Sequence, residues 1–151
     1  MKQLIFSALL LISTATVFAQ SKFSTHELSV NAFRNPSIGL EFRHQHVSIH
    51  AGYYTTAFKS GEYTNFVKTG LTYWFLTIDK KEIPSSFYAG ASYMRGLTRD
   101  YKNKNAAAVE AGFRWMIWKG LNVRLGVVAV TAKGQELKIN PTPGISYAIK
   151  L

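Results

Sequence analysis

The alternation of apolar and polar residues between Ala106 and Ala132 constrains the fold of this chain more than any other feature. Side chains on a β-strand point alternately to two faces, so a period of two indicates strands rather than a helix. One set of alternate positions is apolar: Val109, Ala111, Phe113, Trp115, Ile117, Leu121, Val123, Leu125, Val127 and Ala129. The other set holds Glu110, Gly112, Arg114, Met116, Asn122, Arg124 and Gly126. The pattern predicts a hairpin with one apolar face and one face of charge and glycine.

The turn of this hairpin, Trp118-Lys119-Gly120, determines which residues lie opposite each other. A three-residue turn places Ile117 opposite Leu121 and Arg114 opposite Arg124. A two-residue turn would place Trp118 opposite Leu121 and pair residues of opposite faces, which a period of two forbids. We therefore predict the three-residue turn, with its glycine in the left-handed conformation.

The start of the chain has the pattern of a secretory signal. Lys2 gives a basic start, Leu4 to Ile12 form an apolar run, and Val17-Phe18-Ala19 make a small-residue cleavage site. The apolar run is too short for a spanning helix. We therefore divide the chain into a signal peptide, residues 1–19, cleaved near Ala19, and one domain, residues 20–151, with an uncleaved anchor as the alternative.

The chain has no cysteine and a formal net charge of +10. The first fact excludes a disulfide scaffold, a cysteine-ligated metal site and a lipid anchor on cysteine. The positive net charge could favour binding to nucleic acid, but an exported protein does not meet nucleic acid in the cell. We expect no nucleic-acid partner, and anionic lipid head groups are the expected negative surface.

Alternation of period two recurs along the chain, and we expect eight strands in all. They are His26–Phe33, Ile38–Arg43, Val47–Tyr53, Phe66–Leu76, Phe87–Met94, the two strands of the hairpin, and Ile145–Leu151. They are joined at Asn35-Pro36, His44–His46, Lys59–Glu62, Asp79–Ser85, Arg99–Asn105 and Gly134–Pro143. No helical period occurs outside the signal.

Eight antiparallel strands at this spacing close naturally into an up-and-down barrel. The barrel is either soluble, with its apolar face inside, or membrane-embedded, with its apolar face outside. The glycines decide between these, because they fall in the polar class: Gly39, Gly52, Gly70, Gly90, Gly112, Gly126 and Gly144. A narrow interior needs small residues beside a few large ones, whereas glycine only weakens an exposed strand face. We predict an all-β, eight-stranded antiparallel transmembrane β-barrel.

Aromatic residues gather toward the strand ends, as in the interfacial girdles of membrane barrels. Those expected at one rim are Tyr53, Phe58, Tyr63, Phe66 and Tyr93, and those at the other are Phe75, Phe87, Trp115 and Tyr147. Counting strands from a periplasmic amino terminus places the turns at His44, Asp79 and Trp118 in the periplasm. The loops near Asn35, Lys59, Arg99 and Gly134 then face outward. Basic loop residues there could contact lipopolysaccharide phosphates, or they are simply solvated.

The chain resembles the small eight-stranded outer-membrane β-barrel proteins of Gram-negative bacteria. The resemblance rests on the Val17-Phe18-Ala19 signal, the alternating segments and the last strand, which runs from Gly144 to Leu151. Many members end in an aromatic residue that the assembly machinery reads, whereas this chain ends in Leu151. The resemblance implies an outer-membrane location, contact with membrane lipids and lipopolysaccharide, and insertion by the barrel assembly machinery. Such proteins include structural barrels, adhesion proteins and a few lipid-modifying enzymes.

The inward face of the predicted barrel carries charged residues: Glu41, Arg43, Lys68, Glu110, Arg114 and Arg124, with His50 nearby. Arg114 opposite Arg124 is a repulsive pair unless a carboxylate lies within reach. We predict that Glu41 or Glu110 bridges the two, with Glu41 favoured. The charged set then forms a plug of ion pairs that closes the interior; an anion site or gate is the alternative.

His46 and Ser48 are weak catalytic candidates. Outer-membrane lipid A deacylases, which have the same fold, use a His and a Ser two residues apart with a Glu that orients the His. His44, His46 and His50 could also suggest a metal, but a polar turn explains them equally well. We predict no catalytic residue, no metal and no cofactor.

The expected function is therefore a non-enzymatic structural or surface-interaction role in the outer membrane, with no extracellular partner identified. A lipid-modifying enzyme and a soluble periplasmic lipid-binding barrel are the alternatives.

Overall fold

The computed structural model describes residues 23–33, 37–59 and 61–151. The predicted signal peptide and the Asn35-Pro36 break lie outside these residues. The described chain is all-β except for one short 3-10 helix, η1. Its elements are β1 (His26–Ala32), β2 (Ile38–His44), β3 (Val47–Lys59), β4 (Glu62–Thr77), β5 (Ser86–Gly96), η1 (Arg99–Tyr101), β6 (Asn105–Trp118), β7 (Leu121–Ala132), β8 (Lys138–Pro141) and β9 (Gly144–Lys150). Among the described residues, no helix is long and apolar enough to cross a membrane.

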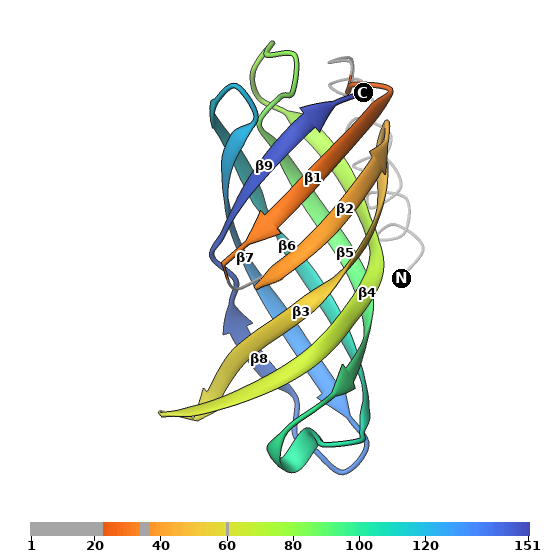
Figure 1. The fold of residues 1–151 in the computed structure, drawn as a ribbon, viewed down its shortest axis with the longest axis vertical. Coiled ribbons are helices and arrows are strands. Elements are labelled where there is room, and N and C mark those ends of the chain that lie inside the picture. Colours follow the sequence, from red (N-terminus) through yellow and green to blue (C-terminus); the bar gives the residue numbers. More distant parts are fainter. Residues whose placement is uncertain (1–22, 34–36, 60) are drawn as a thin grey trace, which may run out of the picture.

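Eight of the nine strands form a closed antiparallel ring. Each strand from β1 to β7 pairs with the next, β7 pairs with β9, and β9 returns to β1. Figure 1 shows that the end of β9, the β2–β3 turn, the β4–β5 connection and the β6–β7 turn share one end, which we call the terminal end. The β3–β4 turn, η1 and the β7–β8 loop lie at the opposite end, which we call the far end.

One face of each strand carries apolar side chains and the other carries mostly polar ones, as the alternation predicted. On β3, Ile49 is 57% exposed and faces outward, whereas Ser48 is 1% exposed and faces the interior of the ring. The same division holds around the ring, because large apolar side chains are exposed and most polar strand residues are buried. The apolar surface of the ring is therefore its outer surface.

Two inward glycines make room for the side chain of Tyr88, which is itself buried. A Cβ atom added at Gly112 would lie 2.6 Å from Oη of Tyr88, and one added at Gly126 would lie 2.9 Å from it. These contacts are closer than real Cβ atoms make. Glycine at these positions therefore serves interior packing, as the sequence indicated, although the large neighbour is an aromatic rather than a charged residue.

The interior has an apolar layer that the sequence analysis did not predict. It lies toward the far end and consists of Tyr54, Phe66, Met94, Tyr101, Ala106, Ala108, Val128, Val130 and Ala132. Phe66 was expected in an outer aromatic girdle, but it is fully buried in this layer. It lies two residues before Lys68, so a period of two places both side chains inside. The charged residues occupy the interior toward the terminal end.

The hairpin of β6 and β7 has the predicted register over most of its length. Arg114 lies opposite Arg124, and Trp115 lies opposite Val123. The predicted partner of Leu121 was wrong, because a β-bulge between Met116 and Trp118 places Trp118, not Ile117, opposite it. The turn is the two-residue Lys119-Gly120, both with positive φ. A bulge adds one residue to one strand, so a two-residue turn no longer conflicts with the alternation.

The predicted Gly134–Pro143 loop contains a strand, β8. Val130 pairs with Lys138 on β8, and the same register continues to Leu121, which pairs with Tyr147 on β9. β8 and β9 are thus two parts of one strand, interrupted at Thr142 and Pro143. Pro141 is tolerated in β8 because, among the described strands, β8 pairs with β7 alone and its other edge is unpaired.

In Figure 1, β3 passes β8 near the far end. In the described part of the chain, side-chain hydrogen bonds and not a backbone ladder join the two strands there. Beyond Tyr53, β3 pairs only with β4 among the described strands, and β8 pairs only with β7. The free edge of β3 is covered by Ser37, whose Oγ accepts from the N–H of Thr55 at 3.0 Å, and by Asn140 of β8. Nδ2 of Asn140 donates to Oγ1 of Thr56 at 2.7 Å and to the carbonyl of Ala57 at 3.2 Å. We call this junction the seam.

Replacing Asn140 with Ala is expected to loosen the seam locally. A hydrogen bond contributes about 0.5–1.5 kcal/mol, so amide exchange should accelerate up to about tenfold in the outer half of β3 and in β8. Hydrogen exchange read by mass spectrometry would measure this, with residues 47–53 of β3 as the internal reference. Lys138→Ala, on the same strand, is the matched control and should leave the exchange unchanged. Equal acceleration along all of β3 would contradict a local seam.

Candidate functional site

The charged residues predicted to face the interior all do so. Glu41, Arg43, Lys68, Arg114 and Arg124 are buried, and the side chain of Glu110 is 7% exposed. They come from β2, β4, β6 and β7, so the closed ring is what brings them together.

Two carboxylates, rather than one, serve the facing arginines. Nη1 of Arg124 lies 2.6 Å from Oε2 of Glu41, and Nη1 of Arg114 lies 2.6 Å from Oε1 of Glu27. The other carboxylate oxygen of Glu27 pairs with Arg43. The prediction that Glu41 or Glu110 bridges both arginines was therefore wrong, and Glu27 was missed. The signal for it was present, because Glu27 alternates with the outward residues of β1.

A fourth buried ion pair lies closer to the apolar layer. Nζ of Lys68 on β4 is 2.6 Å from Oε2 of Glu110 on β6, and it lies 5.6 Å from the centre of the Tyr54 ring. His50 is held by two hydroxyl groups: its Nε2 is 3.1 Å from Oγ of Ser92, and its Nδ1 is 3.3 Å from Oγ1 of Thr72. Each of these polar side chains therefore has a partner inside the ring.

Trp74 is the centre of the charged layer. The guanidinium carbons of Arg114, Arg124 and Arg43 lie 4.4, 5.1 and 5.5 Å from its ring. Nε1 of Trp74 donates to Oγ of Ser48 at 2.9 Å, and Ser48 donates to Glu41 at 2.5 Å. The π-face of an indole attracts cations. The ring therefore separates three like charges while it stabilises each of them.

The Asp79–Ser85 connection closes the terminal end of the ring. Ile83 is buried against Met116 and Ala148, and the carbonyl of Pro84 accepts from Nη2 of Arg114 at 3.1 Å. Partial burial raises the pKa of Asp79, but hydrogen bonds from the hydroxyl and N–H of Ser85 outweigh it, so the pKa lies below its usual value. The inward packing of Ile83 and Pro84 accounts for the length of this connection.

His46 and Ser48 are not arranged as a catalytic pair. Nδ1 of His46 lies 2.9 Å from the carbonyl oxygen of Trp74, whereas Oγ of Ser48 is buried and engaged with Glu41 and Trp74. No hydrogen bond joins His46 to Ser48 in the part of the chain that the structure describes. Within that part, no group of three or more His, Cys, Asp or Glu residues is placed to hold a metal ion.

Among the residues that the structure describes, the interior therefore holds a network of buried ion pairs in which four cations meet three carboxylates, between an apolar layer at one end and a packed connection at the other. No protein-family model, curated protein or solved structure matches this chain.

Proposed function

We propose that this chain is an integral outer-membrane β-barrel protein of a Gram-negative bacterium, with a structural or surface-interaction role. One observation carries the proposal: the ring is apolar outside and charged inside. Leu71, Val109 and Leu125 are exposed on the outer surface, whereas Arg43 and Arg114 are buried within. A water-soluble monomer rarely exposes a large contiguous apolar surface, whereas lipid requires one around a transmembrane barrel.

The closed interior supports a role other than conduction. Ion pairs around Trp74 fill the half toward the terminal end, and the aromatic rings of Phe66 and Tyr101, 5.2 Å apart, fill the half toward the far end. A water-filled channel would require polar side chains around an open path. We therefore propose that the protein acts through its outer surface and its loops, and not by conducting solutes through a pore.

The proposal orients the terminal end toward the periplasm and the far-end loops outward. Those loops carry basic residues, among them Lys102, Lys104 and Lys133. Ammonium groups at this level can bind the phosphates of lipopolysaccharide. Insertion by the barrel assembly machinery is part of the same proposal.

Enzymatic lipid modification is the less favoured alternative. A serine nucleophile needs a base within hydrogen-bond reach and an accessible Oγ, and Ser48 has neither His46 as a partner nor exposure. Comparison of lipid A masses from cells with and without the protein tests the alternative, and we expect identical spectra.

Membrane fractionation tests the proposed location. The full chain, expressed in a Gram-negative host, should be recovered in the outer-membrane pellet and should remain there after an alkaline carbonate wash that removes peripheral proteins. Recovery in the soluble periplasm would contradict the proposal and support the soluble lipid-binding barrel instead.

A further inference from the structure

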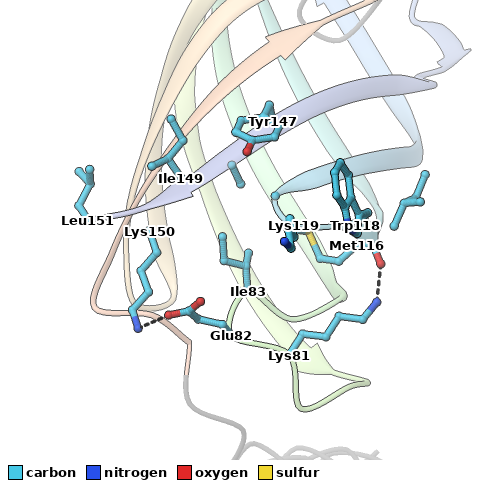
Figure 2. Close-up of a pocket in the computed structure, with 13 residues that line it drawn as sticks. Lys81, Glu82, Ile83, Met116, Trp118, Lys119, Tyr147, Ile149, Lys150 and Leu151 are labelled. Carbon is cyan, nitrogen blue, oxygen red and sulfur yellow. Dashed lines mark hydrogen bonds and ion pairs between the residues drawn. The ribbon is translucent and has the colours of Figure 1, made fainter.

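A cleft of about 800 Å³ opens at the terminal end (Figure 2). The cleft exists because β9 continues beyond Leu121, the first residue of β7. The last β7–β9 pair joins Leu121 to Tyr147, after which only the N–H of Ala148 reaches the carbonyl of Gly120, at 2.9 Å. The β6–β7 turn, the β4–β5 connection and the end of β9 surround the resulting space.

The cleft is apolar on its floor and along its outer side. Ile83, Met116 and Ala148 are buried at its base. Trp118 and Ile149 line its outer side and are exposed, so they continue the apolar outer surface of the ring into the cleft. A hydrocarbon chain that lies along this surface can therefore reach the cleft without crossing a polar strip.

The cleft also carries an excess of positive charge. Lys81, Lys119 and Lys150 line it, and Glu82 is the acidic side chain among the lining residues. Lys81 is also 3.6 Å from the carboxylate of Asp79 in the same connection. Glu82 is 2.7 Å from Nζ of Lys150, and Nζ of Lys81 donates to the carbonyl of Met116 at 2.5 Å. Both interactions are drawn in Figure 2. Lys119 lies 5.6 Å from the Trp118 ring and has no carboxylate partner among the described residues. Its charge is therefore available to an anion.

We propose that this cleft binds one anionic phospholipid, with the phosphate on Lys119 and the acyl chains along Trp118 and Ile149. The inference rests on the proposed function, because the cleft meets lipid only if the outer surface lies in a bilayer. A volume of about 800 Å³ falls within the usual range of ligand sites, and it accommodates a head group with the start of its chains. Lysine binds phosphate as a point charge, and indole and phenol rings favour the membrane interface.

Native mass spectrometry tests the proposal with phosphatidylglycerol and the zwitterionic phosphatidylcholine as probes. The protein, folded into detergent micelles, should retain one phosphatidylglycerol molecule about fivefold more than phosphatidylcholine, since a lysine near a lipid surface contributes about 1 kcal/mol. Lys119→Asn should abolish this preference, and Lys119→Arg should keep it. Asparagine suits the test because Lys119 has a φ of 32°, and asparagine tolerates the left-handed region. Lys80→Asn removes the same charge at the same end of the ring but from an exposed residue that does not line the cleft, so it should leave the preference unchanged.

The outcomes separate this inference from the proposed function. Failure to insert into phosphatidylcholine vesicles would overturn both. Insertion with equal retention of the two lipids, or an equal loss of preference in Lys80→Asn, would overturn the cleft proposal and leave the barrel standing. Displacement of phosphatidylglycerol by millimolar inorganic phosphate would also overturn it, because the cleft would then recognise soluble phosphate and not a lipid.

Discussion

Glu27→Gln is expected to lower the free energy of unfolding by about 3–5 kcal/mol, the usual cost of removing one partner from a buried ion pair. Glu27 is the carboxylate that Arg43 and Arg114 share, and all three side chains are buried. The amide keeps the shape of the side chain but removes its charge, so two buried guanidinium groups lose their compensation together. Thermal or urea unfolding of the protein in detergent micelles would measure the change.

Glu41→Gln is the matched comparison, because Glu41 pairs with one arginine instead of two. Its amide can still accept from Ser48, which lies 2.5 Å from the carboxylate. Because a single buried pair is broken, we expect a loss at the lower end of the same range, about 3 kcal/mol. If Glu41→Gln destabilised the protein as much as Glu27→Gln, the shared role of Glu27 would be wrong.

Trp74→Leu is expected to have an effect of similar size, about 3–5 kcal/mol, as for truncation of a large buried aromatic residue. The substitution removes the ring that lies within 4.4–5.5 Å of three guanidinium carbons, and each cation–π contact is worth about 0.5–2 kcal/mol. It also leaves a cavity between like charges. Unfolding in detergent micelles again gives the measurement.

Trp74→Phe separates the ring from its hydrogen bond. Phenylalanine keeps an aromatic face toward the arginines but cannot donate to Ser48, as Nε1 of Trp74 does at 2.9 Å. We expect a loss of only about 1–2 kcal/mol. An effect as large as that of Trp74→Leu would show that the hydrogen bond, and not the cation–π stacking, is what stabilises this layer.

The alternation of side chains predicted the ring and its two faces, since each strand must present one face to each side. It also predicted that Arg114 faces Arg124, which the structure confirms. It could not predict the bulge before Trp118, because a bulge changes the pairing at one residue and leaves the pattern on either side intact. Nor could it predict which carboxylate each arginine selects, since that depends on distances across the closed ring.

The apolar layer of the interior was missed for a different reason. Val128 and Val130 lie in the inward class that begins with Asn122 and Arg124, but the alternation is lost in Val127-Val128-Ala129-Val130. A continuous apolar run indicates that both faces of the strand are apolar. This run could therefore have predicted that the interior changes from charged to apolar along β7. Phe66 carried the same information, because its spacing from Lys68 gives it an inward position.

Tryptophan fluorescence in vesicles tests the central claim, that the apolar outer surface faces lipid and the charged interior does not. Trp115 is 61% exposed on the outer surface, whereas Trp74 is 0% exposed inside. In two variants, Trp74 or Trp115 is kept as the single tryptophan, and Trp118 and the remaining one are changed to Phe. Each variant is then folded into vesicles of phosphatidylcholine that is brominated on its acyl chains. We predict strong quenching of Trp115, little quenching of Trp74, and protection of both from aqueous iodide. Quenching of Trp115 by iodide and not by brominated lipid would contradict the membrane assignment.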